Sequence, residues 1–577
     1  MDQEKLLVNL VKISLGVLLL RSLYLQIIRF PYYSALSKKQ SIRTIEIGIP
    51  RGKIFDRNGR VLAEDEPCFD LVFVPYDLKH PAEEAALVAR YVSLEESNLK
   101  KIFTRQYRNP FDRIVLKKAL TPEEVASISE NAFQLPGIFV QTGIKRRYVL
   151  GPAAAHLIGH LGEVSEEQLE RWKDRGLKAG DVIGQDGLER YYDDILRGVP
   201  GGILVEVDAL GHHRRILGEK EMQPGDDLYL TIDLSFQKAA AESLGENEGC
   251  VVAMDPRNGQ VLALVNYPAF DPEDPGKSLF KPGKPFLNRA IQGQYPPGSV
   301  FKIITEVAAL ETMTIEEHDR IECQGEMTVG DVIFRCWKEE GHGWVDINLA
   351  LPFSCNIFFG TVGMKTGVSK ILDYARLFHL GQPTGIDLPG EKSGLVPETA
   401  QSGGPLNIAI GQGALLTTPI QLLSLLSTVA NGGNIWKPYL ARKVVSGNGK
   451  IIRDVTPSLL RTAYVTGETM EILKRGLKNV VAFGTGGAAS VPGIAVAGKT
   501  GTAQRGTEET GFSTHGAFAC YAPAENPNIA LVVFLDRGAS KQAARIAGSI
   551  LKKMLLPLEE RGNGESSLSP EEENENF

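Results

Sequence analysis

The feature that most restricts the fold of this chain is an apolar segment at its N-terminus, Leu6 to Ile28. The segment has 23 residues, most of them aliphatic, and about 20 such residues are enough for one helix to span a membrane. Lys12 and Arg21 interrupt it, but long basic side chains can extend toward the membrane surfaces. We therefore predict a membrane anchor at residues 6–28, preceded by a short stub of residues 1–5.

Two other interpretations of the apolar segment stay open. One is a cleaved signal peptide, although no small-x-small cleavage site follows in the residues RFPYYSAL. The other is a buried helix of a soluble domain. Basic residues are more numerous after the segment than before it, so the positive-inside rule alone would place the rest of the chain in the cytoplasm.

The composition limits what the rest of the chain can be. The 577 residues are enough for about three or four domains. Hydrophobic residues make up 43% and charged residues 23%, as in ordinary globular proteins. The net charge of −7 argues against nucleic acid as a partner, because binding phosphates requires a basic surface. Six cysteines in a chain of this length do not make a disulfide-held scaffold.

Two folded regions and a tail follow the predicted anchor. Residues 29–225 contain helix and turn signals but no obvious reaction centre, which predicts a mixed α+β domain. Residues 226–558 have predicted strands at both ends and helices between them, which indicates an α+β domain with an antiparallel sheet flanked by helices. Residues 559–577 are polar and acidic, and we predict a disordered tail.

The first candidate catalytic motif runs from Ser299 to Lys302 and opens an apolar helix. The two side chains lie one helical turn apart on the same face. A serine hydroxyl is a weak nucleophile until a neighbouring base takes its proton, and a lysine can be that base if burial or a nearby cation lowers its pKa. Ser-x-x-Lys is common by chance, so the motif predicts a nucleophile only in combination with others.

The second candidate motif is Ser354-Cys355-Asn356, within a segment predicted to be helical from Leu349 to Phe359. The hydroxyl of Ser354 could relay a proton between two catalytic groups. The amide of Asn356 could hold a substrate carbonyl. This short motif is less specific than the first when it stands alone.

The third candidate motif, Lys499-Thr500-Gly501-Thr502, ends a predicted strand. A glycine in an edge strand would let a ligand backbone approach closely. Lys499 would supply positive charge for a substrate carboxylate and help to lower the pKa of Lys302. The backbone N–H groups of Ser299 and Thr502 could form an oxyanion hole.

All three motifs occur in the order known for penicillin-binding proteins and class A β-lactamases. The sequence resembles the class B penicillin-binding proteins, most of all those of the elongation type, from the anchor to about residue 558. Other segments carry the same resemblance: Arg51–Gly59, Gly187–Glu189, Tyr295–Ser299, Gly411–Gly413 and Thr418–Pro419. The resemblance implies that residues 29–225 are a pedestal domain of the dimerisation type. It also implies that residues 226–558 are a transpeptidase domain with the penicillin-binding or serine β-lactamase fold.

The resemblance also implies a reaction. Ser299 would attack the D-Ala-D-Ala bond of a peptidoglycan stem peptide with Lys302 as the base, D-alanine would leave, and an acyl-enzyme would form. An amine of a neighbouring stem peptide would then complete the cross-link. Asn356, Lys499, Thr500 and Thr502 would bind the substrate, β-lactams would acylate Ser299, and catalysis would need no cofactor.

The same resemblance implies where the protein acts and with what. Members of this family have their N-terminus in the cytoplasm, a single anchor in the inner membrane, and the catalytic domain on the periplasmic side. We follow the family's orientation over the charge count, which makes residues 1–5 a cytoplasmic stub. The expected partner is a rod-type SEDS glycosyltransferase, contacted through the anchor and the pedestal.

Three cysteines and one histidine form a separate cluster in the sequence: Cys323, Cys336, His342 and Cys355. Three thiols and an imidazole are a tetrahedral zinc set, and Cys355 lies inside the second motif. A structural zinc is one interpretation, and the cluster resembles some elongation-type relatives that hold a zinc at matching positions near the second motif. A Cys323–Cys336 disulfide and unpaired buried thiols are the others.

Other functions also remain open at this stage. A β-lactamase or D,D-carboxypeptidase would share the acylation step and differ in the water that deacylates. A division-type transpeptidase would share the whole reaction. A non-catalytic sensor or scaffold would be acylated only by the antibiotic, and turnover that is lost in Ser299→Ala would separate an enzyme from it.

Overall fold

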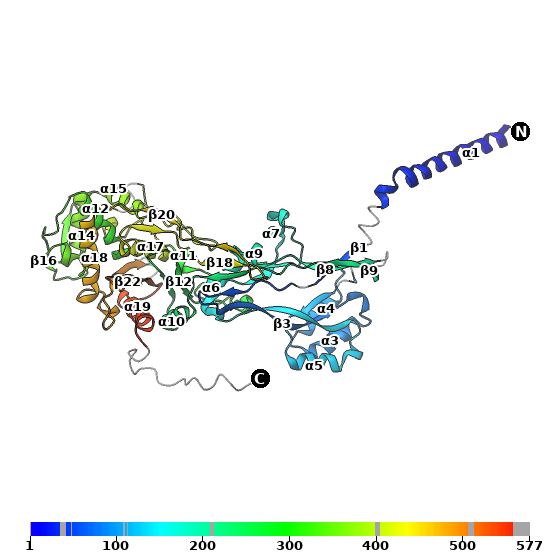
Figure 1. Cartoon of the computed structure of the whole chain (residues 1–577), viewed down its shortest axis with the longest axis horizontal. Coiled ribbons are helices and arrows are strands. Elements are labelled where there is room, and N and C mark those ends of the chain that lie inside the picture. Colours follow the sequence, from blue (N-terminus) through cyan, green and yellow to red (C-terminus); the bar gives the residue numbers. More distant parts are fainter. Residues whose placement is uncertain are drawn as a thin grey trace. The chain divides into compact units, whose positions relative to one another are not determined.

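The structure is a computed structural model that describes residues 2–34, 42–47, 49–107, 110–111, 113–207, 213–398, 404–505 and 513–557 (Figure 1). The predicted acidic tail, residues 559–577, lies outside the described residues. The chain divides into two compact units. The first comprises Met1–Arg51, Asp65–Lys145 and Arg197–Gly225, and the second comprises Gly52–Glu64, Arg146–Leu196 and Asp226–Phe577.

The N-terminal segment of the first unit is helical. Helix α1 (Asp2–Leu23) continues into a π-helical turn, η1 (Tyr24–Ile28). Residues Leu7–Ile28 are long and apolar enough to cross a membrane, with a mean hydropathy of 1.6, and 0% of that stretch is buried within the protein. A helix that leaves its leucines uncovered fits a membrane anchor better than the core helix of a soluble domain.

The rest of the first unit contains two small sheets and three helices. The strands β1 (Ile42–Ile47), β8 (Gly201–Val207) and β9 (His213–Lys220) pair antiparallel in the order β1-β8-β9. Strand β3 (Val61–Phe73) pairs with β5 (Ile138–Tyr148), and the end of β3 pairs with β4 (Ile114–Lys117). Helices α3 (Pro81–Tyr91), α4 (Glu96–Phe103) and α5 (Pro122–Glu130) pack with them around a core that includes Phe73 and Val88.

The second unit is built around a five-stranded antiparallel sheet in the order β12-β11-β23-β22-β21. Its strands are β11 (Gly249–Met254), β12 (Val261–Tyr267), β21 (Ala497–Arg505), β22 (Ser513–Ala522) and β23 (Ile529–Leu535). Two strands come from the start of the domain and three from its end. The predicted α+β class, with an antiparallel sheet closed by distant segments, is confirmed.

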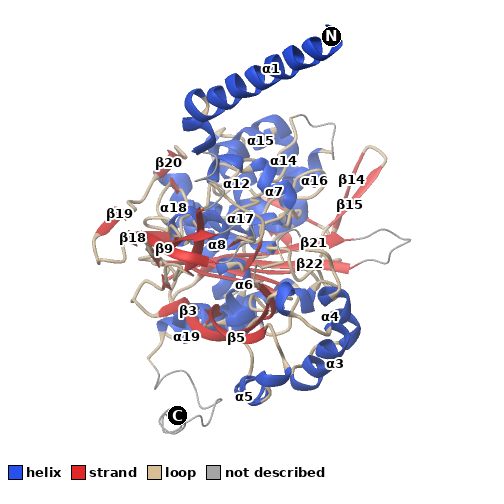
Figure 2. Ribbon diagram, turned by 90° about the vertical axis from the view of Figure 1, so that its right-hand side faces the viewer, coloured by secondary structure: helices blue, strands red, loops and turns tan. Residues whose placement is uncertain are grey.

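Helices cover both faces of this sheet, which explains why every residue of β11 is buried. Along β11, Val251 and Ala253 belong to the apolar core beneath α10 (Leu234–Leu244) and α19 (Ser540–Leu555), while Val252 and Met254 belong to the core on the opposite face. This alternation follows from the two-residue repeat of a strand. Helices α12 (Lys302–Glu311), α14 (Asn356–Thr366), α15 (Val368–Leu377) and α17 (Pro419–Ala430) gather on that opposite side (Figure 2).

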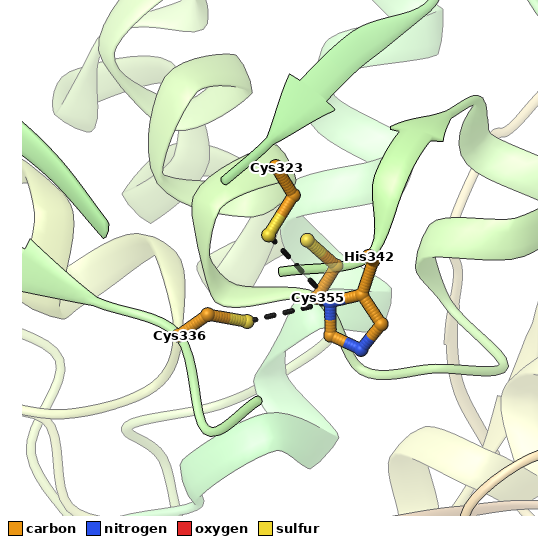
Figure 3. Close-up of side chains that lie close together, drawn as sticks. All are labelled: Cys323, Cys336, His342 and Cys355. Carbon is orange, nitrogen blue, oxygen red and sulfur yellow. Dashed lines mark hydrogen bonds between the residues drawn. The ribbon is translucent and has the colours of Figure 1, made fainter. Parts of the chain in front are cut away.

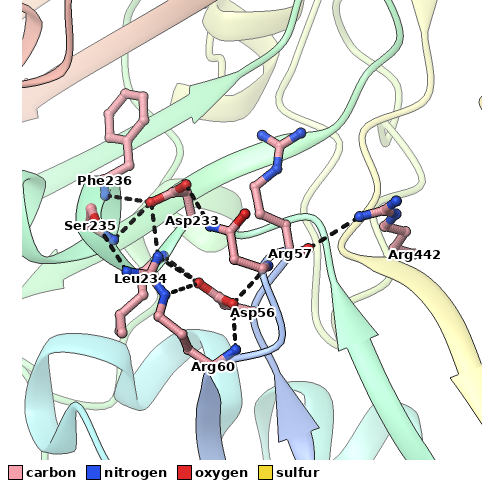
Figure 4. Close-up of polar contacts among 9 residues, drawn as sticks. Asp56, Arg57, Arg60, Asp233, Leu234, Ser235, Phe236 and Arg442 are labelled. Atoms are coloured by element: carbon pink, nitrogen blue, oxygen red, sulfur yellow. Dashed lines mark hydrogen bonds and ion pairs between the residues drawn. The ribbon is translucent and has the colours of Figure 1, made fainter.

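A second sheet of this unit includes the hairpin that Asn58 and Gly59 predict. Strand β2 (Ile54–Phe55) pairs antiparallel with the start of β3 and parallel with β10 (Asp227–Leu230), and β18 (Ala441–Val445) and β19 (Ile451–Asp454) continue the sheet. The turn is held by Asp56, which accepts hydrogen bonds from the backbone N–H groups of Asn58 and Arg60 at 2.8 Å each. Its carboxylate also accepts from Arg60 Nε at 2.7 Å and from the N–H of Leu234, the first residue of α10, at 3.2 Å (Figure 4). The hairpin is therefore tied to the start of the helix that supports the main sheet.

A buried histidine of this unit makes its stability depend on pH. His156 is 3% exposed, and its Nε2 lies 2.8 Å from the carbonyl oxygen of Pro285. Burial lowers the pKa of His156 from 6.5 to about 4, with Arg289 acting in the same direction and the Pro285 carbonyl opposing both. The folded state therefore keeps this imidazole neutral, whereas the unfolded chain takes up a proton below pH 6.5.

We expect the free energy of unfolding to fall as the pH is lowered from about 6.5 to about 4, by about 3 kcal/mol in all from this one group. Urea unfolding of the detergent-solubilised chain at several pH values would measure it. In His156→Gln, whose amide can still donate to Pro285, this part of the pH dependence should disappear. If the variant lost as much unfolding free energy as wild type over this pH range, His156 would not be the group responsible.

Candidate active site

Ser299 lies directly before the helix that the first motif predicts. It sits in a 3-10 turn, η7 (Gly298–Phe301), that leads directly into α12, and it lines a cavity of about 570 Å³. Gly298 has a φ of +55°, and a Cβ there would lie 2.6 Å from the carbonyl oxygen of Thr502. Only glycine therefore allows the turn with Ser299 to approach the strand with the third motif so closely.

Lys302 lies under this turn with no solvent exposure. Its Nζ donates to the Ser354 carbonyl oxygen at 2.8 Å, to Ser354 Oγ at 3.1 Å and to Asn356 Oδ1 at 2.7 Å. Burial lowers the pKa of Lys302 to about 7, and the nearby thiols of Cys355 and Cys336 oppose that shift. The first and second motifs, more than 50 positions apart, are thus joined by hydrogen bonds through one amine.

The helix predicted over Leu349–Phe359 is interrupted, and this part of the prediction is wrong. Helix α13 ends at Ala350 and α14 begins at Asn356. Between them Ser354 adopts a left-handed conformation, with a φ of +53°, which an uninterrupted helix cannot contain. The break turns the carbonyl and hydroxyl of Ser354 toward Lys302 and puts Asn356 in the first turn of a new helix.

The third motif lies on β21, at the edge of the main sheet. Thr500 and Thr502 line the cavity, whereas Lys499 is fully buried. Burial lowers the pKa of Lys499 well below its usual value, with Lys302 adding to the shift and Glu306 opposing it. A Cβ at Gly501 would lie 3.0 Å from Val300 Cγ2. This glycine therefore lets the turn that carries Ser299 approach the strand closely, whereas the sequence analysis expected a ligand backbone at that place.

The cavity brings together five of the eight predicted catalytic residues with side chains from other elements. Its described lining consists of Ser299, Arg335, Cys336, Trp337, Ser354, Asn356, Ile410, Gln412, Thr485, Thr500, Thr502, Thr514 and Ser540. Six of these had no motif to point to them: Arg335, Trp337, Ile410, Thr485, Thr514 and Ser540. For Arg335 and Trp337 there was an indirect signal, because they flank Cys336, a predicted metal ligand.

Glu306 is a further ionisable residue that the sequence analysis missed. It lies one turn after Lys302 on α12 and is 1% exposed. Burial raises the pKa of its carboxyl group to about 8, although Lys499 and Arg475 oppose the shift. An acidic residue four positions after Lys302 in an otherwise apolar helix was the available signal. The buried ionisable groups beneath the cavity therefore include two amines and one carboxyl group.

The four residues of the cysteine and histidine cluster lie side by side, as Figure 3 shows. Their ligand atoms all lie within 4.8 Å of one another, and His342 Nδ1 is 3.6 Å from Cys323 Sγ and 3.5 Å from Cys336 Sγ. Ligands on a tetrahedral zinc with ordinary bond lengths would be about 3.6 Å apart. All six cysteines are free thiols, so the structure has no Cys323–Cys336 disulfide. The residues present therefore fit a four-coordinate zinc.

Comparisons with protein families match both regions of the chain. Residues 249–556 match the family described as penicillin binding protein transpeptidase domain, and residues 46–230 match the penicillin-binding protein dimerisation domain.

Several curated proteins are similar over nearly the full length. The chain is 33% identical to peptidoglycan D,D-transpeptidase MrdA of Acinetobacter baumannii, over 95% of this chain and 87% of that protein. It is 31% identical to MrdA of Escherichia coli K12, over 94% and 91%. It is also 30% identical to stage V sporulation protein D of Bacillus subtilis, over 93% and 82%.

Solved structures agree with these similarities. A chain in a complex between penicillin-binding protein PBP2 and MreC from Helicobacter pylori has a TM-score of 0.76 at 25% identity, covering 89% of this chain and 98% of that one. A chain in a structure on polymerization and crosslinking by a peptidoglycan synthase complex has a TM-score of 0.69 at 28% identity, covering 96% and 98%.

Proposed function

Since this chain belongs to the class B penicillin-binding proteins of the PBP2 type and is a peptidoglycan D,D-transpeptidase of cell-wall elongation, we propose that Ser299 is its nucleophile. The observation that carries this proposal is the cavity that Ser299 shares with Ser354, Asn356, Thr500 and Thr502. These residues come from three segments distant in sequence, and a single substrate could contact them all.

The proposed reaction runs through an acyl-enzyme. Ser299 Oγ attacks the carbonyl carbon between the two D-alanines while its proton passes to Lys302, directly or through Ser354, whose hydroxyl is 3.1 Å from Lys302 Nζ. With a pKa of about 7, part of the Lys302 population is an unprotonated amine at neutral pH. The proton then goes to the leaving D-alanine. An amine of a second stem peptide displaces Ser299 and forms the cross-link.

The other residues of the motifs would position the substrate and stabilise charge. The backbone N–H groups of Ser299 and Thr502 would donate to the oxygen of the tetrahedral intermediate. Asn356, Thr500 and Thr502 line the cavity, and their amide and hydroxyl groups would bind the peptide. Lys499 is buried, so we propose that its positive charge acts from beneath the cavity by helping to lower the pKa of Lys302. Gly501 keeps the strand close to the turn that carries Ser299.

A fluorescent penicillin tests the nucleophile, because a β-lactam mimics the D-Ala-D-Ala bond and leaves a stable acyl adduct. We expect one label per chain, and peptide mapping should find it on Ser299. A label on any other residue, such as Ser354 or Ser540, would end the proposed mechanism.

We also propose a structural zinc ion held by Cys323 Sγ, Cys336 Sγ, His342 Nδ1 and Cys355 Sγ. When bound, the metal would brace the fold and take no part in the reaction. Cys355 lies between Ser354 and Asn356, and its Sγ accepts a hydrogen bond from the Phe358 N–H at 3.4 Å, as the N-cap of α14. The ion would therefore hold the start of α14, where the second motif contacts Lys302.

We further propose the membrane topology and partners that the family suggests. Residues 6–28 would be a single-pass inner-membrane anchor, residues 29–225 the pedestal and residues 226–558 the transpeptidase domain. The catalytic domain would lie on the periplasmic side, because its peptidoglycan substrate is outside the cytoplasm. Similarity to a chain from a structure on polymerization and crosslinking by a peptidoglycan synthase complex supports a partner that polymerises peptidoglycan, which the family resemblance makes a rod-type SEDS glycosyltransferase. Similarity to a PBP2–MreC complex supports an MreC-like partner.

A further inference from the structure

The charge that faces the catalytic cavity comes from a residue outside the three motifs. Among the described residues that line the cavity, Arg335 is the single side chain with a positive charge. Lys302 and Lys499 have no exposed surface and are absent from that lining. The Arg335 side chain is 72% exposed, and a guanidinium stays positively charged across the physiological pH range. A substrate entering the cavity therefore meets this cation directly.

Arg335 is held in place by the catalytic network itself. It is the last residue of β15 (Val332–Arg335), and its carbonyl oxygen accepts a hydrogen bond from Asn356 Nδ2 at 3.3 Å. The same Asn356 side chain accepts from Lys302 through its oxygen. Arg335 Nε pairs with Glu326 Oε2 at 3.4 Å, and both side chains are largely exposed, so solvent screens that pair and a ligand can replace it.

Trp337 lies beside Arg335 on the same wall of the cavity. Its indole N–H donates to the Phe353 carbonyl oxygen at 2.9 Å, and its ring packs edge-on against His342 with centroids 5.3 Å apart. The side chain is nevertheless 57% exposed. These contacts fix the indole while leaving apolar surface open to a ligand.

We propose that Arg335 and Trp337 form a recognition edge that binds a free carboxylate of the stem peptide, upstream of its D-Ala-D-Ala end. The planar guanidinium of Arg335 forms charge-assisted hydrogen bonds with the carboxylate. Trp337 covers the neighbouring apolar atoms of the peptide. The inference rests on the proposed function, since it names a substrate feature of the same site. The carboxylate belongs either to the donor peptide or to the acceptor peptide, which share this chemistry.

The test compares two synthetic pentapeptides that both end in D-Ala-D-Ala. The free carboxyl group of their second residue, a γ-linked D-glutamate, is left as a carboxylate in one and converted to a carboxamide in the other. With the full chain in detergent, D-alanine release gives kcat/KM for each donor. Cross-linking to matched carboxylate and carboxamide acceptor peptides tests whether the carboxylate belongs to the acceptor. Wild-type protein should prefer the carboxylate in one of these arms by about tenfold.

Arg335→Gln should abolish that preference by lowering kcat/KM for the carboxylate peptide about tenfold, with little change for the carboxamide peptide. Arg335→Lys should keep part of it. Lys338→Gln is the matched control, because Lys338 is an exposed cation on the same segment that is not among the described residues lining the cavity, and it should keep the preference unchanged.

Penicillin acylation separates this inference from the proposed function. Arg335→Gln should be acylated at Ser299 at a rate within about twofold of wild type, because penicillin lacks the upstream carboxylate. An equal loss on both peptides and on penicillin would mean that Arg335 maintains the cavity in general, and would overturn the inference. Absence of preference in wild type in both arms would do the same. Failure of wild type to label at Ser299 would instead overturn the proposed function.

Discussion

Ser299→Ala is expected to abolish both penicillin labelling and D-alanine release, with kcat reduced by about 10⁴ or more. The expectation follows from covalent catalysis, since without the hydroxyl no acyl-enzyme can form and only substrate positioning remains. The folded state should hardly change, because the Ser299 hydroxyl makes no hydrogen bond within the described part of the chain. Rates of labelling and turnover, with thermal unfolding of the same samples, would measure these effects.

A second serine in the cavity is the matched control for this variant. Ser540 also lines the cavity, and its hydroxyl lies 3.0 Å from Thr502 Oγ1. Ser540→Ala should keep stoichiometric labelling and change its rate only a few-fold. Stoichiometric labelling of Ser299→Ala would show that another residue is the nucleophile.

Cys336→Ser is the second substitution with a large expected effect, because it removes one ligand of the proposed zinc. Zinc content should fall from about one equivalent to nearly none, and the free energy of unfolding should drop by about 3 kcal/mol or more. Acylation should slow as well, because Cys336 lies between two residues of the cavity wall. Without the zinc, the start of α14 with the second motif would also be held less firmly. Metal analysis, chemical unfolding and penicillin labelling would measure the three effects.

Cys68→Ser is the control for loss of a thiol. Cys68 is half-buried and lies in the other compact unit of the chain, so this variant should keep its zinc. A chelator should lower the unfolding temperature of wild type and of Cys68→Ser, but not that of Cys336→Ser. Less than half an equivalent of zinc in wild type purified without chelator would rule out the metal, and a reductant-sensitive unfolding temperature would then favour the disulfide.

Local sequence signals accounted for the parts of the fold that depend on neighbouring residues. The apolar N-terminal stretch predicted a spanning helix, Asn58-Gly59 predicted a hairpin, and Ser299 to Lys302 predicted a nucleophile at the start of a helix. In each case the signal extends over a few consecutive residues, because turn conformation, helix capping and apolar periodicity act over that range. The resemblance to a family added the order of three such motifs and hence the reaction.

Sequence signals failed where the outcome depended on contacts between distant segments. The helix predicted across Ser354 is broken, because that residue turns its backbone toward Lys302, 52 positions away. Strand register decided that Thr500 faces the cavity and Lys499 does not, and a side-chain repeat of two residues makes that choice all or none.

The sequence by itself thus determined the family and its reaction, through three short motifs in a known order, and it predicts Ser299 as the nucleophile. Tertiary structure alone decided which charge the substrate meets. Arg335 has no motif of its own, and it borders the cavity where Asn356 donates a hydrogen bond to its backbone carbonyl oxygen. Burial removes both motif lysines from the cavity surface, and burial is a property of the packed chain that residue order does not display.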